Sequence, residues 1–187
     1  MVNLIKNFKL ILGKKNYSSV RKYFIRYYSL SIRAKLKKFE GNLNGKNKTF
    51  QIKFLNEDDF PDVKNFFKNN LTKKDKSFLN RFSRKEYFKN DSIRLGVFDN
   101  NRLIASVVIY VRGYRNFEFG IAVSKRYRSI GITSAAFKMF IDFCKSERGK
   151  HFVRIHKKND ISKNFFKKRG YKTYKSEKNL IYMRNDL

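Results

Sequence analysis

The segment Val123-Ser-Lys-Arg-Tyr-Arg-Ser-Ile-Gly-Ile-Thr-Ser134 decides the fold, because it joins a predicted strand to the start of a predicted long helix. The first N–H groups of a helix lack partners within the helix, and the helix dipole places positive charge beside them. Such a turn suits a pyrophosphate, provided that the ligand can approach the backbone. Gly131 gives that room, since glycine has no Cβ. Other side chains of the segment can offer an anion hydrogen bonds or positive charge: Arg126, Arg128, Thr133 and Ser134.

The pattern Arg-x-x-Gly-x-Thr by itself also fits an ordinary strand-to-helix turn, so its surroundings decide between the two readings. Apolar runs and alternations predict strands at residues 50–55, 93–98, 103–111, 117–123, 152–155, 171–174 and 180–183. Apolar side chains at helical spacing predict helices through about residue 70, over 71–87, over 130–146 and over 161–169. The resulting order is β, α, α, β, β, β, α, β, α, β, β, without an internal repeat.

A second segment lies between a predicted strand and a predicted helix: Asn159-Asp-Ile-Ser-Lys-Asn-Phe-Phe-Lys-Lys-Arg-Gly-Tyr171. The two segments together resemble the cofactor-binding segments of the GCN5-related N-acetyltransferase (GNAT) superfamily. The first resembles that family's Arg/Gln-x-x-Gly-x-Gly/Ala loop. The second resembles its pattern of Asn-x-x-Ala/Ser, an aromatic pair and Gly-Phe/Tyr. Two matches in the expected order are more specific than either one, and the resemblance covers residues 49–187.

The resemblance implies the fold class α/β (α+β), with a mixed, mostly antiparallel central sheet of six to seven strands flanked by about four helices. It also implies acetyl-CoA as the cofactor, CoA as the co-product and no metal. Carried over residue by residue, it places cofactor contacts at Ile121, Ala122, Val123, Arg126, Arg128, Ser129, Ile130, Gly131, Ile132, Thr133, Ser134, Asn159, Phe165 and Phe166.

The chain departs from the family pattern at three positions. Thr133 stands where the family has Gly or Ala, and Ser129 replaces a frequent Gly. Phe166 stands where many members carry a Tyr thought to protonate the leaving thiolate. Because phenylalanine has no proton to donate, positive charge stabilises the thiolate, another donor serves, or catalysis is impaired.

Acyl transfer to an amine requires a neutral nitrogen, and an alkylammonium has a pKa near ~10.4. A carboxylate can remove that proton directly or through water. The resemblance places a general base at Glu118, and burial between Phe117 and Phe119 would strengthen it as a base. The alternative is a surface glutamate paired with one of the many lysines. A backbone N–H near Ala122 or Val123 is expected to polarise the thioester carbonyl, where a local splay of the strand frees a donor.

The histidine and cysteine side chains are weaker candidates for catalytic roles. His156 follows the strand before the second segment and is a weaker catalytic candidate, because a lone histidine is more often structural. Cys144 is expected to be a structural thiol on the long helix. A single cysteine also excludes an internal disulfide and a cysteine-based metal site.

The chain has 187 residues, with 45 Lys+Arg against 15 Asp+Glu and a formal net charge of +30. This charge favours polyanionic partners, although abundant Lys, Asn, Phe, Tyr and Ile also fit the codon bias of an AT-rich genome. Residues 1–48 hold thirteen Lys/Arg and one acid, a net of 13 − 1 = +12. Residues 18–38 have the spacing of a basic amphipathic helix, and residues 42–48 resemble a turn. We therefore expect a basic, helical N-terminal extension over 1–48 and a GNAT acyltransferase domain over 49–187.

The expected function is N-acyl transfer, most simply of an acetyl group from acetyl-CoA to a primary amine by direct attack within a ternary complex. The alternative is a module that binds nucleic acid or an anionic membrane surface, partly through residues 1–48, on the same scaffold with weak or no catalysis. The positive charge favours an anionic acceptor, such as a nucleotide-linked amino sugar or tRNA. No run approaches the ~18 apolar residues of a membrane span, and the N-terminus lacks a secretory cleavage site. We therefore expect a cytoplasmic protein, and the oligomeric state stays open.

Overall fold

The computed structural model describes residues 19, 23–70, 83, 87–88 and 91–185, and these form an eight-stranded sheet with the strand order β1-β2-β3-β4-β5-β6-β8-β7. The strands are β1 (Gly41–Asn44), β2 (Thr49–Phe54), β3 (Ser92–Asp99), β4 (Arg102–Gly113), β5 (Asn116–Val123), β6 (Lys150–His156), β7 (Lys172–Ser176) and β8 (Leu180–Arg184). β5 and β6 pair in parallel, whereas every other neighbouring pair is antiparallel. The predicted mixed, mostly antiparallel sheet is therefore confirmed.

The count of six to seven strands was too low, because β1 was predicted to be a turn. Its four residues bury one side chain, Leu43, and its glycine and asparagines have the composition of a loop. β1 forms because its backbone pairs with β2, where Leu43 lies opposite Phe50. Hydrophobic periodicity does not predict such a strand, because one buried side chain in four residues gives no alternating apolar pattern.

The described helices are the N-terminal helix (residues 23–36), α2 (Phe60–Asn70), α5 (Ile132–Ser146) and α6 (Asp160–Lys167), with 3-10 turns η1 (Lys37–Phe39) and η2 (Lys125–Tyr127). These agree with the predicted helices. α5 begins two residues later than predicted, because Ser129 and Gly131 have positive φ angles of 66° and 94°. The helical region predicted over 71–87 lies almost entirely outside the described residues.

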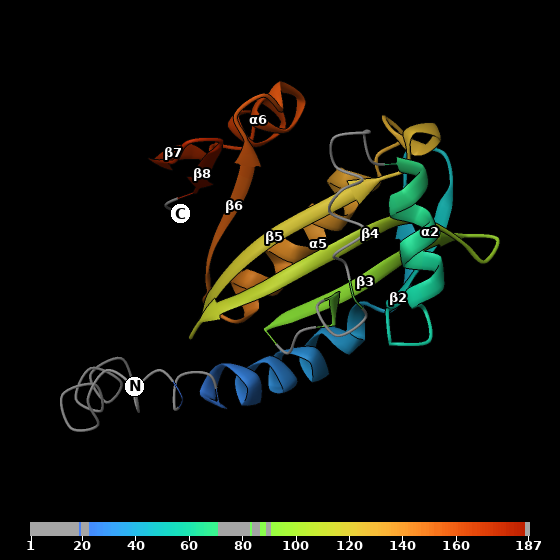
Figure 1. Cartoon of the computed structure of the whole chain (residues 1–187), viewed down its shortest axis with the longest axis horizontal. Helices are drawn as coiled ribbons and strands as arrows, with labels where there is room; N and C mark the ends of the chain where they lie inside the picture. Colours follow the sequence, from blue (N-terminus) through green and yellow to red (C-terminus); the bar gives the residue numbers. More distant parts are fainter. Residues whose placement is uncertain (1–18, 20–22, 71–82, 84–86, 89–90, 186–187) are drawn as a thin grey trace.

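α5 and α2 cover opposite faces of the sheet (Figure 1). The face toward α5 holds the main core, in which Phe119 of β5 packs its ring 5.4 Å from Phe137 and 5.0 Å from Phe140. The face toward α2 carries a smaller apolar cluster that includes Val63 and Phe66. Because successive strand residues point to opposite faces, odd-numbered residues of β5 enter the main core and even-numbered residues face the other side.

The N-terminal helix and β1 also join the main core. Ile32, Leu36 and Leu43 are buried in it, and Lys35 forms an ion pair of 2.8 Å with Glu147 at the end of α5. The segment over residues 23–44 therefore packs on the same core as the rest of the sheet. The division of the chain at residue 48 stays a prediction.

Candidate functional site

β5 and β6 pair over only part of their length, and we call the place where these two strands separate the β5–β6 cleft. Their parallel ladder joins Asn116–Phe119 to Lys150–Val153 and then ends. β6 continues to His156 with β8 as its partner, and Figure 1 shows it diverging from β5. α5 follows β5 and α6 follows β6, so the N-termini of both helices lie at this end of the sheet. Their positive dipole ends make the cleft suitable for an anionic ligand.

The open edge of β5 presents a backbone donor to this cleft. The N–H of Ser124 donates to the carbonyl of Ile104 on β4 at 2.8 Å. Backbone groups of successive strand residues point to alternate sides, so the N–H of Val123 points away from β4. On that side the carbonyl of Val123 accepts a hydrogen bond from Nε of Arg128 at 3.5 Å, and β6 has already diverged. Of the two predicted positions, the geometry thus favours Val123 over Ala122 as the donor.

Gly131 also has a structural role that was not predicted. A Cβ added to Gly131 would lie 3.1 Å from the backbone N of Lys46, in the turn between β1 and β2. The Lys46 N–H donates to the carbonyl of Ile130 at 2.8 Å. A Cβ on Gly45 would lie 2.9 Å from that same carbonyl oxygen. The glycine therefore serves its left-handed backbone and the close contact with the β1–β2 turn, and its role in leaving room for a ligand stays a prediction.

A second contact holds the loop from the β3–β4 turn. The Tyr127 hydroxyl donates to Asp99 at 3.0 Å, and Nζ of Lys48 lies 2.6 Å from the same carboxylate. The hydrogen bond from Lys48, reinforced by that from Tyr127, lowers the pKa of Asp99 below its usual value. The hydrogen bond between Tyr127 and Asp99 raises the pKa of the Tyr127 hydroxyl. The loop is thus connected to two hairpin turns, which stiffens it before any ligand binds.

The start of α5 is also joined to α6 by an arginine that sequence reasoning missed. Arg169 donates to Oγ of Ser134 at 3.1 Å and to the carbonyl of Phe165 at 2.9 Å, and its guanidinium lies 3.6 Å from the centre of the Phe165 ring. Arg126 and Arg128 are exposed on the loop itself. The signal for Arg169 was its place beside Gly170 in the second segment.

The second segment is explained largely by helix geometry. Oδ1 of Asn159 caps α6 by accepting a hydrogen bond from the N–H of Ser162 at 3.1 Å. Phe166 is 6% exposed, with ring centroids 5.3 Å from Phe137 and 5.4 Å from Tyr171. The side chain at the family's acid position is therefore part of the core.

Glu118 lies at the vertex of the cleft and is paired with two arginines. Its side chain is 6% exposed, with Oε2 2.7 Å from Nε of Arg112 and Oε1 3.2 Å from Nε of Arg154. The alternative of a surface glutamate paired with lysine is therefore wrong. Both carboxylate oxygens have a guanidinium partner, and each oxygen keeps a further lone pair that can accept a proton from an amine.

His156 is not brought close to Glu118. Phe152 pairs with Glu118, and His156 lies four residues further along β6, a distance of roughly 13 Å at 3.3 Å per residue. The His156 side chain is exposed, and its Nδ1 accepts a hydrogen bond from the N–H of Lys158 at 3.3 Å. Cys144 is buried and burial raises the pKa of its thiol, in agreement with a structural role.

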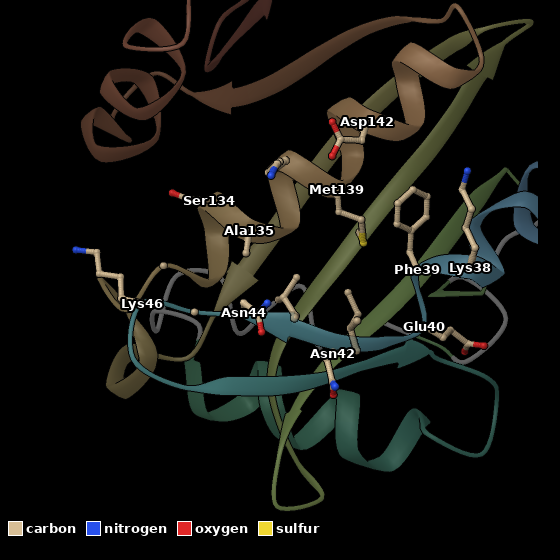
Figure 2. Close-up of a pocket in the computed structure, with 15 residues that line it drawn as sticks. Lys38, Phe39, Glu40, Asn42, Asn44, Lys46, Ser134, Ala135, Met139 and Asp142 are labelled. Atoms are coloured by element: carbon tan, nitrogen blue, oxygen red, sulfur yellow. The ribbon is translucent and has the colours of Figure 1, made fainter.

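A hollow of about 790 Å³ lies on the other side of α5, between this helix and β1. Figure 2 shows Asn44 and Lys46 on one wall and Ser134, Met139 and Asp142 on the other. The hollow reaches Gly131 and Ser134 at the start of α5 and is separate from the β5–β6 cleft.

Within the described residues, no group of three or more His, Cys, Asp or Glu side chains is arranged to hold a metal ion. The part of the chain that the structure describes also contains no helix long and apolar enough to cross a membrane.

Comparisons with known proteins agree with this geometry. The model of the acetyltransferase (GNAT) family matches residues 55–171. The GNAT domain of S. lividans PAT superposes with a TM-score of 0.62 at 16% identity, over 80% of this chain and 98% of that one. The PaiA N-acetyltransferase from Thermoplasma acidophilum, in complex with coenzyme A, gives 0.58 at 13% identity, over 75% and 100%. Campylobacter jejuni N-acetyltransferase PseH, in complex with acetyl coenzyme A, gives 0.51 at 16% identity, over 71% and 96%. A search of curated proteins gave no significant match.

Proposed function

Because the chain belongs to the acetyltransferase (GNAT) family, we propose that it is an acyl-CoA-dependent N-acyltransferase, most simply an N-acetyltransferase acting on a primary amine. The observation that carries this proposal is the separation of β5 and β6 beside the N-terminus of α5. This arrangement offers a backbone donor and a positive helix end in one cleft. Relatives of the same fold have been solved with coenzyme A or acetyl coenzyme A.

The residues at the cleft fit acetyl-CoA, which would supply an activated acetyl thioester. The first N–H groups of α5 and the exposed Arg126 and Arg128 suit its pyrophosphate. Arg169 adds a third positive charge at that helix end. The N–H of Val123 suits the thioester oxygen. Of the other predicted contacts, Phe165 is half-buried beside Arg169, whereas Phe166 supports the site from within the core.

In the proposed reaction, the acceptor nitrogen forms a bond to the acetyl carbon as the carbon–sulfur bond breaks. The nitrogen loses a proton, and we propose Glu118 as the group that takes it, directly or through water. Each carboxylate oxygen keeps a lone pair beside its arginine partner, so Glu118 can accept the proton while both ion pairs stay in place. Because Phe166 cannot protonate the sulfur, the leaving thiolate takes its proton from water or is stabilised by the arginines of the loop. His156 is exposed and distant from Glu118, so its catalytic role is a weaker proposal.

Binding of acetyl-CoA tests this proposal first. Calorimetry of the purified chain should show one acetyl-CoA bound per protein, and acetyl transfer to an amine panel should release free thiol. No detectable heat at millimolar acetyl-CoA would overturn the proposed function. As a variant test, Arg128→Ala should weaken acetyl-CoA binding by about tenfold, as expected for the loss of a charged phosphate contact.

The acceptor is proposed to be an anionic amine, such as a nucleotide-linked amino sugar or an aminoacyl group on tRNA, because the net charge of +30 repels polycations. A cytoplasmic location also belongs to the proposal.

One observation favours the alternative role of the N-terminal segment. The N-terminal helix exposes Tyr23, Tyr27 and Leu30, with 73%, 78% and 59% of their surfaces accessible. Their spacing places them on one helix face, near the exposed Arg26. This pattern suits binding at an anionic membrane surface. Flotation with phosphatidylserine vesicles should show binding that salt weakens and that Tyr27→Ser reduces, and binding that neither change affects would contradict this role.

A further inference from the structure

The sheet face opposite α5 carries a band of arginine and aromatic side chains around Glu118. Residues that pair across neighbouring strands point to the same face of the sheet. The pairs Tyr110–Glu118, Glu118–Phe152 and Arg154–Tyr182 therefore place side chains of β4, β5, β6 and β8 on one face. We call this set the arginine–tyrosine band: Arg94, Tyr110, Arg112, Glu118, Arg154, Tyr174, Tyr182 and Arg184. It crosses the sheet where the β5–β6 cleft begins.

One half of the band lies on β3 and β4. The guanidinium of Arg112 lies 4.3 Å from the centre of the Tyr110 ring, and that of Arg94 lies 5.2 Å from it. Nε of Arg94 is also held by the carbonyl of Tyr87 at 3.1 Å. These contacts fix the orientation of two guanidinium groups over one aromatic ring.

The other half lies on β6, β7 and β8. Tyr174 is 44% exposed, and its ring centre lies 6.3 Å from that of Tyr182 and 6.5 Å from that of Phe152. The guanidinium of Arg184 lies 5.0 Å from the Tyr174 ring. This half therefore presents an exposed aromatic ring with a cation beside it.

Glu118 joins the two halves. It accepts a hydrogen bond from Nε of Arg112 and forms an ion pair with Arg154, and its negative charge offsets the repulsion between the two guanidinium groups. A guanidinium has five N–H donors, so each arginine keeps Nη groups beyond those held by Glu118. Arg112 approaches one further carboxylate, Asp91, at 3.7 Å. The band itself holds four arginines and one carboxylate, a net charge of 4 − 1 = +3, and further carboxylates at its edges are Asp91 beside Arg112 and Glu177 beside Tyr182.

We propose that the arginine–tyrosine band binds the nucleotide part of the acceptor, with a phosphate on Arg112 and Arg154 and a base on the Tyr174 ring. Planar guanidinium groups recognise phosphate through paired hydrogen bonds, and every nucleobase can stack on an exposed aromatic ring. The band begins beside the cleft, so a nucleotide bound there would place an attached amine toward Glu118. This inference rests on the proposed function, because it assigns the acceptor of that same site.

The test is nucleotide binding to the full chain saturated with CoA, because CoA itself contains a nucleotide and would otherwise compete for the probe. Uridine 5′-diphosphate is expected to bind the CoA-saturated protein, and uridine or inorganic phosphate alone to bind at least about tenfold more weakly. Failure of CoA itself to bind would overturn the proposed function. Normal CoA binding without nucleotide binding at ~5 mM would overturn this inference alone.

Variants then locate the probe. Arg154→Ala should weaken the binding of uridine diphosphate and of inorganic phosphate by about tenfold each. Tyr174→Ala should weaken the binding of the nucleotide only. Lys145→Ala removes the same unit of charge from an exposed position on α5, across the sheet, and should leave binding within about twofold. Equal effects of Lys145→Ala and Arg154→Ala would show a general charge effect and would contradict the proposed site.

The same assay separates two sources of the nucleotide. A 12-nucleotide single-stranded RNA that binds more tightly than uridine diphosphate, with a steep salt dependence, would assign the band to an RNA end. Preference for uridine diphosphate with a shallow salt dependence would assign it to a free nucleotide-linked amine. Both results support recognition of a nucleotide, and binding of neither probe overturns it.

Discussion

Replacement of Glu118 by glutamine separates its two proposed roles, as the general base and as the anion that joins Arg112 to Arg154. The amide keeps the shape of the side chain but removes its charge. It also offers only one oxygen acceptor in place of two. Each role predicts a different kinetic result, and the ion pairs predict a loss of stability in either case.

The size of the stability loss follows from the two contacts of 2.7 and 3.2 Å. The hydrogen bond from Arg112, as one to a charged group, contributes about 1.5–3 kcal/mol, whereas the ion pair with the more exposed Arg154 contributes about 0–1 kcal/mol. The arginine side chains are 31% and 38% exposed, so solvent screens them and about half of the summed value is appropriate. One weaker bond to the amide oxygen remains in the variant. The free energy of unfolding should therefore fall by roughly 1–2 kcal/mol, which lowers Tm by about 2–8 °C for a chain of this size.

Steady-state kinetics distinguish the roles. If Glu118 takes the proton of the amine, Glu118→Gln should lower kcat by about 10²–10⁴-fold, leave KM for acetyl-CoA near its wild-type value and remove the acid limb of the pH–rate profile. If it only positions the arginines, kcat should change by less than about tenfold and KM for a nucleotide-linked amine should rise. The matched control is Glu147→Gln, because Glu147 is 11% exposed, is paired with Lys35 at 2.8 Å and lies at the far end of α5. It should lower Tm by less, because only one ion pair with an exposed lysine is lost, and leave kinetics unaltered. Wild-type kcat, acceptor KM and pH profile in Glu118→Gln would refute both roles.

Three further predictions concern the loop and its supports. Gly131→Ala should destabilise the fold by about 1–3 kcal/mol in thermal denaturation, because φ at this residue is 94° and the new Cβ would lie 3.1 Å from the backbone N of Lys46. The control is Gly113→Ala, whose new Cβ would have no atom within 4 Å and which should change Tm little. Asp99 has a lowered pKa, so its stabilising contribution is present above the unfolded pKa near ~3.9 and is lost as pH falls through the folded value. The Tm difference between wild type and Asp99→Asn should therefore shrink below about pH 4, and a constant difference from pH 7 to 3 would contradict this reasoning. Asn159→Ala should cost about 1 kcal/mol through loss of the α6 cap, and Asn159→Ser should restore most of it; equal Tm values for both variants would argue against capping.

Most of the sheet was predictable because each strand carries its own apolar pattern in the sequence. β4 and β5 are long and strongly apolar, and α5 carries a clear apolar face. β1 escaped prediction because its stability comes from pairing with β2 and from one buried leucine. The late start of α5 escaped it as well, because a positive φ at a serine is uncommon and has no composition signal.

The candidate site divides in the same way. The loop before α5 and the Asn159 segment were found from residue types at fixed spacing, which is local information. Arg169 and the pairing of Arg112, Glu118 and Arg154 were missed, because these contacts join residues on different strands and helices. Glu118 was identified as a candidate base from its strand, but its two arginine partners could not be derived from that strand.

The sequence by itself determined the family, the order of the described elements from β2 onward and the position of the loop before α5, because each depends on residue types at short spacing along the chain. Only the tertiary structure decided that β5 and β6 separate after Phe119, that residues 23–44 pack on the same core, and that an arginine–tyrosine band surrounds Glu118. These features depend on strand register and on packing between distant segments, and the free energy of such contacts is defined only once the chain has brought them together.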